Sequence, residues 1–174
     1  MPKDMNPAYF GDSYDLVKRF FCHELVSLGY TIAIDPMFTG SWNGTEQHFY
    51  RLIGTSPESD TKSSSKRRAL FIDPDTGVNP SGSKSHVSYD RLAKEAAHSE
   101  LVFSFDQSFS RRATPTTVMQ TKLAALQALN CRAMYYDSHA RFLFVSKEWH
   151  PLHELRVHLV SLGLPESRLL AVGI

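Results

Sequence analysis

Short apolar segments that each end in an aspartate do most to restrict how this chain can fold. The segments 31–34, 69–72, 101–105 and 132–136 have the length and the β-branched or aromatic content of strands. Stretches with helical spacing lie between several of them. Because strands that alternate with helices build sheets covered on both faces, we expect an α/β fold, a three-layer sandwich around a mainly parallel sheet.

The expected helices have recognisable ends. Asp12 or Ser13 is placed to cap a first helix that ends at Gly29, and Pro115 follows the cap residue Thr114 of another. Residues 46–53 fit either a helical turn or a strand. The apolar face expected for the first helix consists of Leu16, Val17, Phe20, Phe21, Leu25 and Leu28.

A tight turn predicts one antiparallel hairpin near the C-terminus. Residues 137–140 join the strand 132–136 to a second apolar segment, 141–145, over a distance too short for a helical crossover. A helix is expected over 151–162 and a last strand over 169–172.

The chain is expected to form a single domain, 1–174, because its 174 residues can bury one substantial core. Segment 55–68 is polar and serine-rich and ends in closely spaced cations, so it cannot bury an apolar face. We expect it to be a mobile surface loop whose cations are solvated.

Composition excludes several classes of protein. The formal net charge of +1 provides no global basic field, and no stretch approaches the roughly 20 apolar residues of a membrane span. The N-terminus lacks the apolar core of a signal peptide. Cys22 and Cys131 are too few for a disulfide framework. These features favour a cytoplasmic protein that is not bound to a membrane.

The aspartates at the strand ends are the main candidates for chemistry. Asp35, Asp73, Asp106 and Asp137 each follow a predicted strand, and Asp75 lies two residues after Asp73. In open α/β sheets, ligands bind outside the carboxyl ends of the strands. Carboxylates gathered there either share a divalent metal or accept hydrogen bonds from a ligand. The competing interpretation is that aspartate is common in turns and helix caps.

The segment Asp73-Pro74-Asp75-Thr76-Gly77 is the most pointed local signal. Proline restrains the backbone on both sides of its bond and fixes the preceding carboxylate at the sheet edge, while glycine lets a ligand approach closely. An ordinary turn would have the same composition. Further candidates for contacts with a substrate are Lys84, Asp106, Arg111, Arg141 and His139, the last as a proton shuttle.

Three motifs occur in a familiar order. YFGDSYDLVK at 9–18, PMFT at 36–39 and FIDPDTG at 71–77 resemble motifs of a group of uncharacterised bacterial proteins. More distantly, the same order resembles the ribosomal-RNA adenine-N6 methyltransferases. That resemblance implies a Rossmann-like, methyltransferase-like sheet with S-adenosylmethionine as the cofactor.

The resemblance also implies roles for particular residues. Asp73 and Pro74, with Asp75, would stand at the catalytic motif, where Asp73 would accept a hydrogen bond from the target amine. The sequence departs from the family in having Asp75 where an aromatic residue would stack on a flipped base, and one glycine rather than two in the cofactor loop. The residues that would contact the cofactor are Asp35, Pro36, Phe38 and Gly40.

Three functions remain open on the sequence alone. The first is a diverged S-adenosylmethionine-dependent methyltransferase acting on a nucleic-acid or nucleotide amine. The second is a phosphoesterase or nuclease in which Asp35, Asp73 and Asp75 hold Mg²⁺ or Mn²⁺. The third is a non-enzymatic module that binds nucleic acid or protein.

Overall fold

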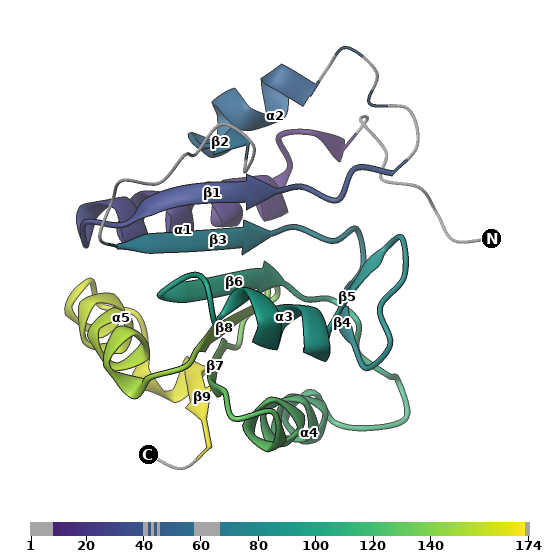
Figure 1. Ribbon diagram of the computed structural model, residues 1–174, viewed down its shortest axis with the longest axis vertical. Coiled ribbons are helices and arrows are strands. Elements are labelled where there is room, and N and C mark those ends of the chain that lie inside the picture. Colours follow the sequence, from purple (N-terminus) through teal and green to yellow (C-terminus); the bar gives the residue numbers. More distant parts are fainter. Residues whose placement is uncertain (1–8, 40–41, 43, 45, 58–66, 173–174) are drawn as a thin grey trace.

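The computed structural model describes residues 9–39, 42, 44, 46–57 and 67–172. The strands of its main sheet are β1 (Thr31–Asp35), β2 (Ser56–Pro57), β3 (Arg68–Ile72), β6 (Leu101–Phe105), β7 (Arg132–Tyr136), β8 (Phe142–Ser146) and β9 (Leu169–Ala171). Within the described residues these strands lie in the order β2-β1-β3-β6-β8-β7-β9 (Figure 1). Two short strands, β4 (Gly77–Asn79) and β5 (His86–Ser88), pair separately with each other.

The sheet is mixed, so the expectation of a mainly parallel sheet is not confirmed. The pairs β1–β2, β1–β3 and β3–β6 are parallel, whereas β6–β8, β8–β7 and β7–β9 are antiparallel. The expected hairpin of β7 and β8 is present, but β8 is inserted between β6 and β7. This insertion, together with β9, makes the C-terminal half of the sheet antiparallel.

Helices cover both faces of the sheet, as expected for a three-layer α/β fold (Figure 1). On one face α1, α2 and α5 enclose a core rich in phenylalanine, and on the other α3 and α4 pack over a smaller aliphatic core together with β4 and β5. The undecided segment 46–53 is helical. The helices are α1 (Ser13–Ser27), α2 (Glu46–Ile53), α3 (Tyr89–Glu95), α4 (Pro115–Ala128) and α5 (Trp149–Ser161), with a 3₁₀ turn, η3 (Glu166–Arg168).

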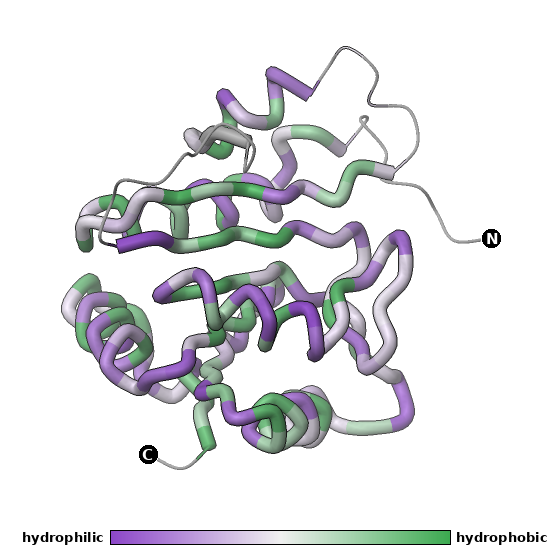
Figure 2. Tube along the Cα trace, in the orientation of Figure 1, coloured by the Kyte–Doolittle hydropathy of each residue, from purple (hydrophilic) through white to green (hydrophobic). Residues whose placement is uncertain are grey.

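The central strands are buried on both faces, which explains why they read as continuous apolar runs. In β3, Ala69 and Phe71 face one core while Leu70 and Ile72 face the other. Figure 2 shows the trace of β3 as hydrophobic over most of its length. The Phe71 ring stacks on that of Phe103 with centroids 4.7 Å apart. No helix in the described part of the chain is long and apolar enough to cross a membrane.

Two expected helix caps are confirmed. The Asp12 carboxylate accepts hydrogen bonds from the backbone N–H groups of Tyr14 and Asp15 at the start of α1. Thr114 caps α4 by accepting a hydrogen bond from Thr117, and Pro115 is the first helical residue.

The loop expected at 55–68 is only partly described, because 58–66 lie outside the described residues. At its end Arg67 is not a solvated cation. Its guanidinium forms ion pairs with Glu100, at 2.8 Å, and with Glu154, at 2.5 Å, and also donates to the Tyr30 hydroxyl. Arg67 therefore joins the start of β6, α5 and the segment before β1 at the edge opposite the aspartates.

Candidate functional site

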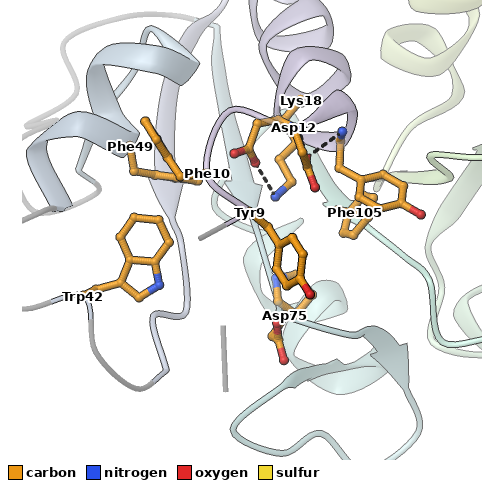
Figure 3. Close-up of a pocket in the computed structure, with 11 residues that line it drawn as sticks. Tyr9, Phe10, Asp12, Lys18, Trp42, Phe49, Asp75 and Phe105 are labelled. Carbon is orange, nitrogen blue, oxygen red and sulfur yellow. Dashed lines mark hydrogen bonds and ion pairs between the residues drawn. The ribbon is translucent and has the colours of Figure 1, made fainter. Parts of the chain in front are cut away.

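The main cavity lies at the carboxyl ends of β1, β3 and β6, beside the N-terminus of α1. Its volume is about 440 Å³, within the range of small-molecule sites. We call this cavity the pocket (Figure 3). This is the edge at which open α/β sheets bind their ligands.

Aromatic side chains form much of the wall of the pocket. Trp42 packs edge-on against Phe10 and Phe49, with ring centroids 6.2 and 5.9 Å away, while the Tyr14 ring contacts Phe105 at 5.1 Å. Figure 3 shows Trp42, Phe10 and Phe49 on one side of the pocket and Phe105 on the other. The aromatic lining residues are Tyr9, Phe10, Tyr14, Trp42, Phe49 and Phe105.

The remaining lining is mostly charged. Asp12, Asp15 and Asp75 contribute carboxylates, and Lys18 contributes the one ammonium group among the described lining residues, which also include Pro74. Lys18 Nζ donates a hydrogen bond to Asp15 Oδ1 at 3.0 Å, and Asp15 Oδ2 accepts one from the backbone N–H of Gly11. The lysine is held between α1 and the end of β3.

Asp73 lies beneath Lys18, which forms the floor of the pocket together with the end of β3. Its carboxylate is fully buried, and Oδ2 lies 2.9 Å from Lys18 Nζ in an ion pair. Among the described residues, neither oxygen of Asp73 accepts a hydrogen bond of good geometry. Burying this carboxylate is costly, because it has lost its water and is compensated by the ion pair with Lys18 but by no good hydrogen bond from the described residues.

The ionisation of this group reflects that cost. Burial is the main cause that raises the pKa of Asp73; the Lys18 ammonium opposes the rise, the charges of Asp15 and Asp75 add to it, and the net result is a pKa of about 6. Burial also acts to lower the pKa of Lys18, but attraction to Asp73 and Asp15 outweighs it, so the net shift is upward. The thiol of Cys22, buried nearby, has a raised pKa and is inert at neutral pH.

The face that α1 turns toward the sheet differs from the expected one. Leu16 is 57% exposed, and the buried positions include two charged ones. The sequence did contain a signal for this burial. Asp15 and Lys18 are three residues apart within the YDLVK motif, and their helical spacing places them on the same face as the buried apolar residues. The buried residues of α1 are Asp15, Lys18, Phe21, Cys22 and Leu25.

The predicted catalytic segment contributes to the pocket in part. Pro74 and Asp75 line it, whereas Asp73 is 0% exposed and reaches it only through Lys18. We expected Gly77 to let a ligand approach closely, but it does not. A Cβ there would lie 2.2 Å from Asp106 Oδ1, and φ is +139°, so glycine is needed to admit the side chain of Asp106.

The predicted cofactor loop lies beside the pocket rather than around it. Asp35 pairs with Arg91 of α3 and accepts a hydrogen bond from the backbone N–H of Met37. Phe38 stacks on Trp42, with centroids 4.9 Å apart, and so supports one wall from behind. Pro36 is buried without lining the pocket, and Gly40 lies outside the described residues.

The other predicted substrate contacts are dispersed. Asp106 is buried in a hydrogen-bonded network with Lys122 and Tyr135 on the opposite face of the sheet. Exposed His139 stacks on Tyr14, a lining residue, with centroids 4.7 Å apart. Arg141 pairs with Asp137 and lies over the Phe109 ring. The remaining two, Lys84 and Arg111, are exposed on loops.

The structure does not bring the aspartates together around a common point. In the described ranges no group of three or more histidine, cysteine, aspartate or glutamate side chains is placed to hold a metal ion. Asp35 and Asp73 are instead each paired with a cation of the chain, Arg91 and Lys18.

Comparison with known proteins gives no match: no family model fits the chain, and no curated protein or solved structure resembles it significantly.

Proposed function

We propose that the pocket binds S-adenosylmethionine, and that the protein is a diverged methyltransferase acting on an amine of a nucleic acid or nucleotide. The observation that carries this proposal is the lining of the pocket, where aromatic rings and an excess of carboxylates meet at the carboxyl ends of the parallel strands.

The aromatic wall suits a purine. Trp42 contacts Phe10 and Phe49 edge-on, and all three residues line the pocket, where they offer aromatic surface to a planar group that enters it. Stacking of a base on such rings contributes about 1–3 kcal/mol and requires no particular hydrogen bonds. The adenine of the cofactor is the part that would use this wall.

The charge of the pocket favours this ligand over a phosphate ester. Among the described lining residues there are three carboxylates and one ammonium group, that of Lys18, which is already paired with Asp15 and Asp73. A phosphate group would meet like charges and a lysine that is not available to it. A sulfonium cation, and the hydroxyl groups of a ribose, would meet hydrogen-bond acceptors and opposite charge.

The residues in and beneath the pocket would have different roles in binding and transfer. The start of α1, with Asp12 and Asp15, holds the polar part of the cofactor, and Asp75 accepts a hydrogen bond from the target amine. Asp73, being buried, fixes Lys18 and through it the floor of the pocket. The bound cofactor would supply an electrophilic methyl group, and a carboxylate beside the amine favours the loss of its proton after transfer.

A calorimetric titration with S-adenosylmethionine, run with and without magnesium, tests the proposal. We expect micromolar binding that is unaffected by the metal. Replacing Trp42 with alanine should weaken that binding at least about tenfold, as the loss of one stacking surface would. The replacement of Trp149, which lies on α5 away from the pocket, by phenylalanine is the control and should change nothing. Heat released by magnesium alone would contradict the proposal and favour phosphoester chemistry.

A further inference from the structure

The turn that precedes α1 is tied to the first turn of the helix by a side chain. The backbone N–H of Gly11 donates a hydrogen bond to Asp15 Oδ2 at 2.8 Å, and the N–H of Asp12 donates to the carbonyl oxygen of Tyr9 at 3.1 Å. Gly11 has a φ of +80°, a left-handed conformation that glycine adopts at little cost. The chain therefore turns at Gly11, and the Asp15 carboxylate holds that turn from the side of the helix.

Asp15 is itself held by the lysine of the floor. Its other oxygen, Oδ1, accepts a hydrogen bond from Lys18 Nζ at 3.0 Å, and the same ammonium group lies 2.9 Å from Asp73 Oδ2. The side chains of Asp15 and Lys18 are each 9% exposed. Because both oxygens of Asp15 have a partner within the chain, the carboxylate is fixed in one orientation, with Oδ2 directed at Gly11.

The lining residue next to this turn is Phe10. Its ring lies edge-on to that of Trp42, with centroids 6.2 Å apart, and both residues line the pocket. Trp42 is 5% exposed, whereas Phe10 is 38% exposed and belongs to neither core of the described part of the chain. One edge-on ring contact gains no more than the ordering of the backbone of one residue costs, so it cannot hold Phe10 in place by itself.

We propose that Asp15 is a positioning residue of the pocket: held by Lys18, it fixes Gly11 and through that turn sets Phe10 against Trp42 in the aromatic wall. The inference rests on the proposed function for the purpose of the wall, which is to stack on a planar group. It goes beyond that function in assigning what keeps the wall in place. The links run from the end of β3 through α1 to the turn before the helix, so the floor and the wall of the pocket form one unit.

The fluorescence of Trp42 tests this inference without any ligand. A parent protein with Trp149→Phe keeps Trp42 as its only tryptophan, and quenching by acrylamide reports how accessible that ring is. Phe10→Ala removes the contact directly, and we expect it to raise the quenching constant about twofold. Asp15→Ala should produce most of that rise, because Phe10 then loses its place. The double variant should be quenched no more than Phe10→Ala alone, since the effect of Asp15 passes through Phe10.

A variant that loses the same kind of bond elsewhere is the matched control. Thr114→Ala removes the side-chain acceptor of the backbone N–H of Thr117 at the start of α4, on the other face of the sheet. It should lower the stability of the protein and leave the quenching of Trp42 unchanged. Asp15→Asn keeps the volume of aspartate and one acceptor oxygen, which can serve Gly11 or Lys18 but not both. Its quenching constant should lie between those of the parent and Asp15→Ala.

The outcomes distinguish positioning from a purely structural role. If the Asp15 variants unfolded more easily but were quenched like the parent, the inference would be overturned and Asp15 would only stabilise α1. A double variant quenched more strongly than Phe10→Ala would also overturn it, because Asp15 would then act on Trp42 by another route. If Asp15→Ala does not fold, Asp15→Asn decides alone, between a rise in quenching and no change.

S-adenosylmethionine enters only in a second titration, which keeps this inference separate from the proposed function. Failure of the parent to bind it would overturn the proposed function and leave the result of the quenching experiment standing. If the parent binds it, Asp15→Ala should bind at least as weakly as Phe10→Ala. Binding by Asp15→Ala as tight as that of the parent would overturn the positioning role and leave the proposed function standing.

Discussion

Two buried pairs of aspartate and lysine follow neighbouring strands, and they differ in how the carboxylate is satisfied. Asp73, after β3, lies against Lys18 of α1 on one face of the sheet, and Asp106, after β6, lies against Lys122 of α4 on the other. Both carboxylates are 0% exposed. The first pair lies beneath the pocket, and the second lies away from it.

The Asp106 carboxylate is fully hydrogen bonded. Oδ1 accepts from the N–H of Val78, at 2.9 Å, and from the N–H and hydroxyl of Ser108, while Oδ2 accepts from Lys122 and Tyr135, both at 2.6 Å. The bonds link β4, β6, β7 and α4. Such a network fixes one arrangement of the chain, which is a structural role.

The Asp73 carboxylate has an ion pair but no good hydrogen bond among the described residues, and its pKa is raised to about 6 by burial. Its partner Lys18 is shared with Asp15 and faces the pocket. A buried, ion-paired carboxylate with incomplete hydrogen bonding beside a cavity is typical of a binding site, where such groups are kept at the expense of stability. We therefore propose a structural role for Asp106 and a role in binding for the floor of the pocket around Asp73.

The largest effect that the comparison predicts follows removal of the charge of Asp106. In Asp106→Asn, Lys122 stays buried without its counter-charge, and the hydrogen bond from Tyr135 loses a charged acceptor. We expect the free energy of unfolding to fall by about 3–5 kcal/mol in urea denaturation at pH 7. A loss below about 1 kcal/mol would show that this network is not what holds the two layers together.

A somewhat smaller effect is expected at Gly77. In Gly77→Ala the new methyl group would lie 2.2 Å from Asp106 Oδ1 and 2.9 Å from the backbone nitrogen of Gln107, at a φ of +139°. We expect a loss of about 2–3 kcal/mol, measured in the same way. Gly163→Ala is the control, because φ is +92° there and no atom lies within 4 Å, so only the backbone strain of about 1 kcal/mol applies. Equal losses at the two sites would mean that the approach of Asp106 imposes no constraint.

The pH dependence of stability should come from Asp73 in a defined window. Its pKa is 3.8 when exposed and about 6 in the folded protein, so the folded state binds the proton more tightly. Stability linked to Asp73 is therefore greatest below pH 4 and is lost as the pH rises toward 6, by on the order of 2 kcal/mol. The measurement is the difference in unfolding free energy between the wild type and Asp73→Asn from pH 4 to 7, in which other groups cancel. A constant difference would contradict the raised pKa.

The positions of most elements along the chain could be predicted from the sequence. Cap residues, short apolar runs and helical spacing are local signals, so Asp12, Thr114, Pro115 and most strands were found where expected. The position of β8 between β6 and β7 could not be predicted, because strand order depends on contacts between distant segments.

The candidate site was predicted only in part for the same reason. Strand ends can be read from the sequence, and they gave Pro74 and Asp75 correctly as residues of the sheet edge beside the pocket. Which cation pairs with each carboxylate depends on the tertiary structure, so the pairing of Asp73 with Lys18 was not predicted. Lys18 looked like an ordinary charged residue of an amphipathic helix, although its position in register with Phe21 and Leu25 placed it on the buried face.

The smallest effect on stability is the one that most directly separates the two pairs. In Asp73→Asn the lysine keeps Asp15 as its partner, no good hydrogen bond to Asp73 from the described residues is lost, and the penalty for burying a carboxylate disappears. We therefore expect the free energy of unfolding at pH 7 to change by less than about 1 kcal/mol, against several for Asp106→Asn. Binding of S-adenosylmethionine should respond in the opposite order: it should weaken in Asp73→Asn, where Lys18 shifts toward Asp15 and the floor loses a negative charge. A folded Asp106→Asn protein, by contrast, should bind as the wild type does. If both variants lost stability equally and neither changed binding, Asp73 would be a structural residue like Asp106, and the pocket would have to be explained without it.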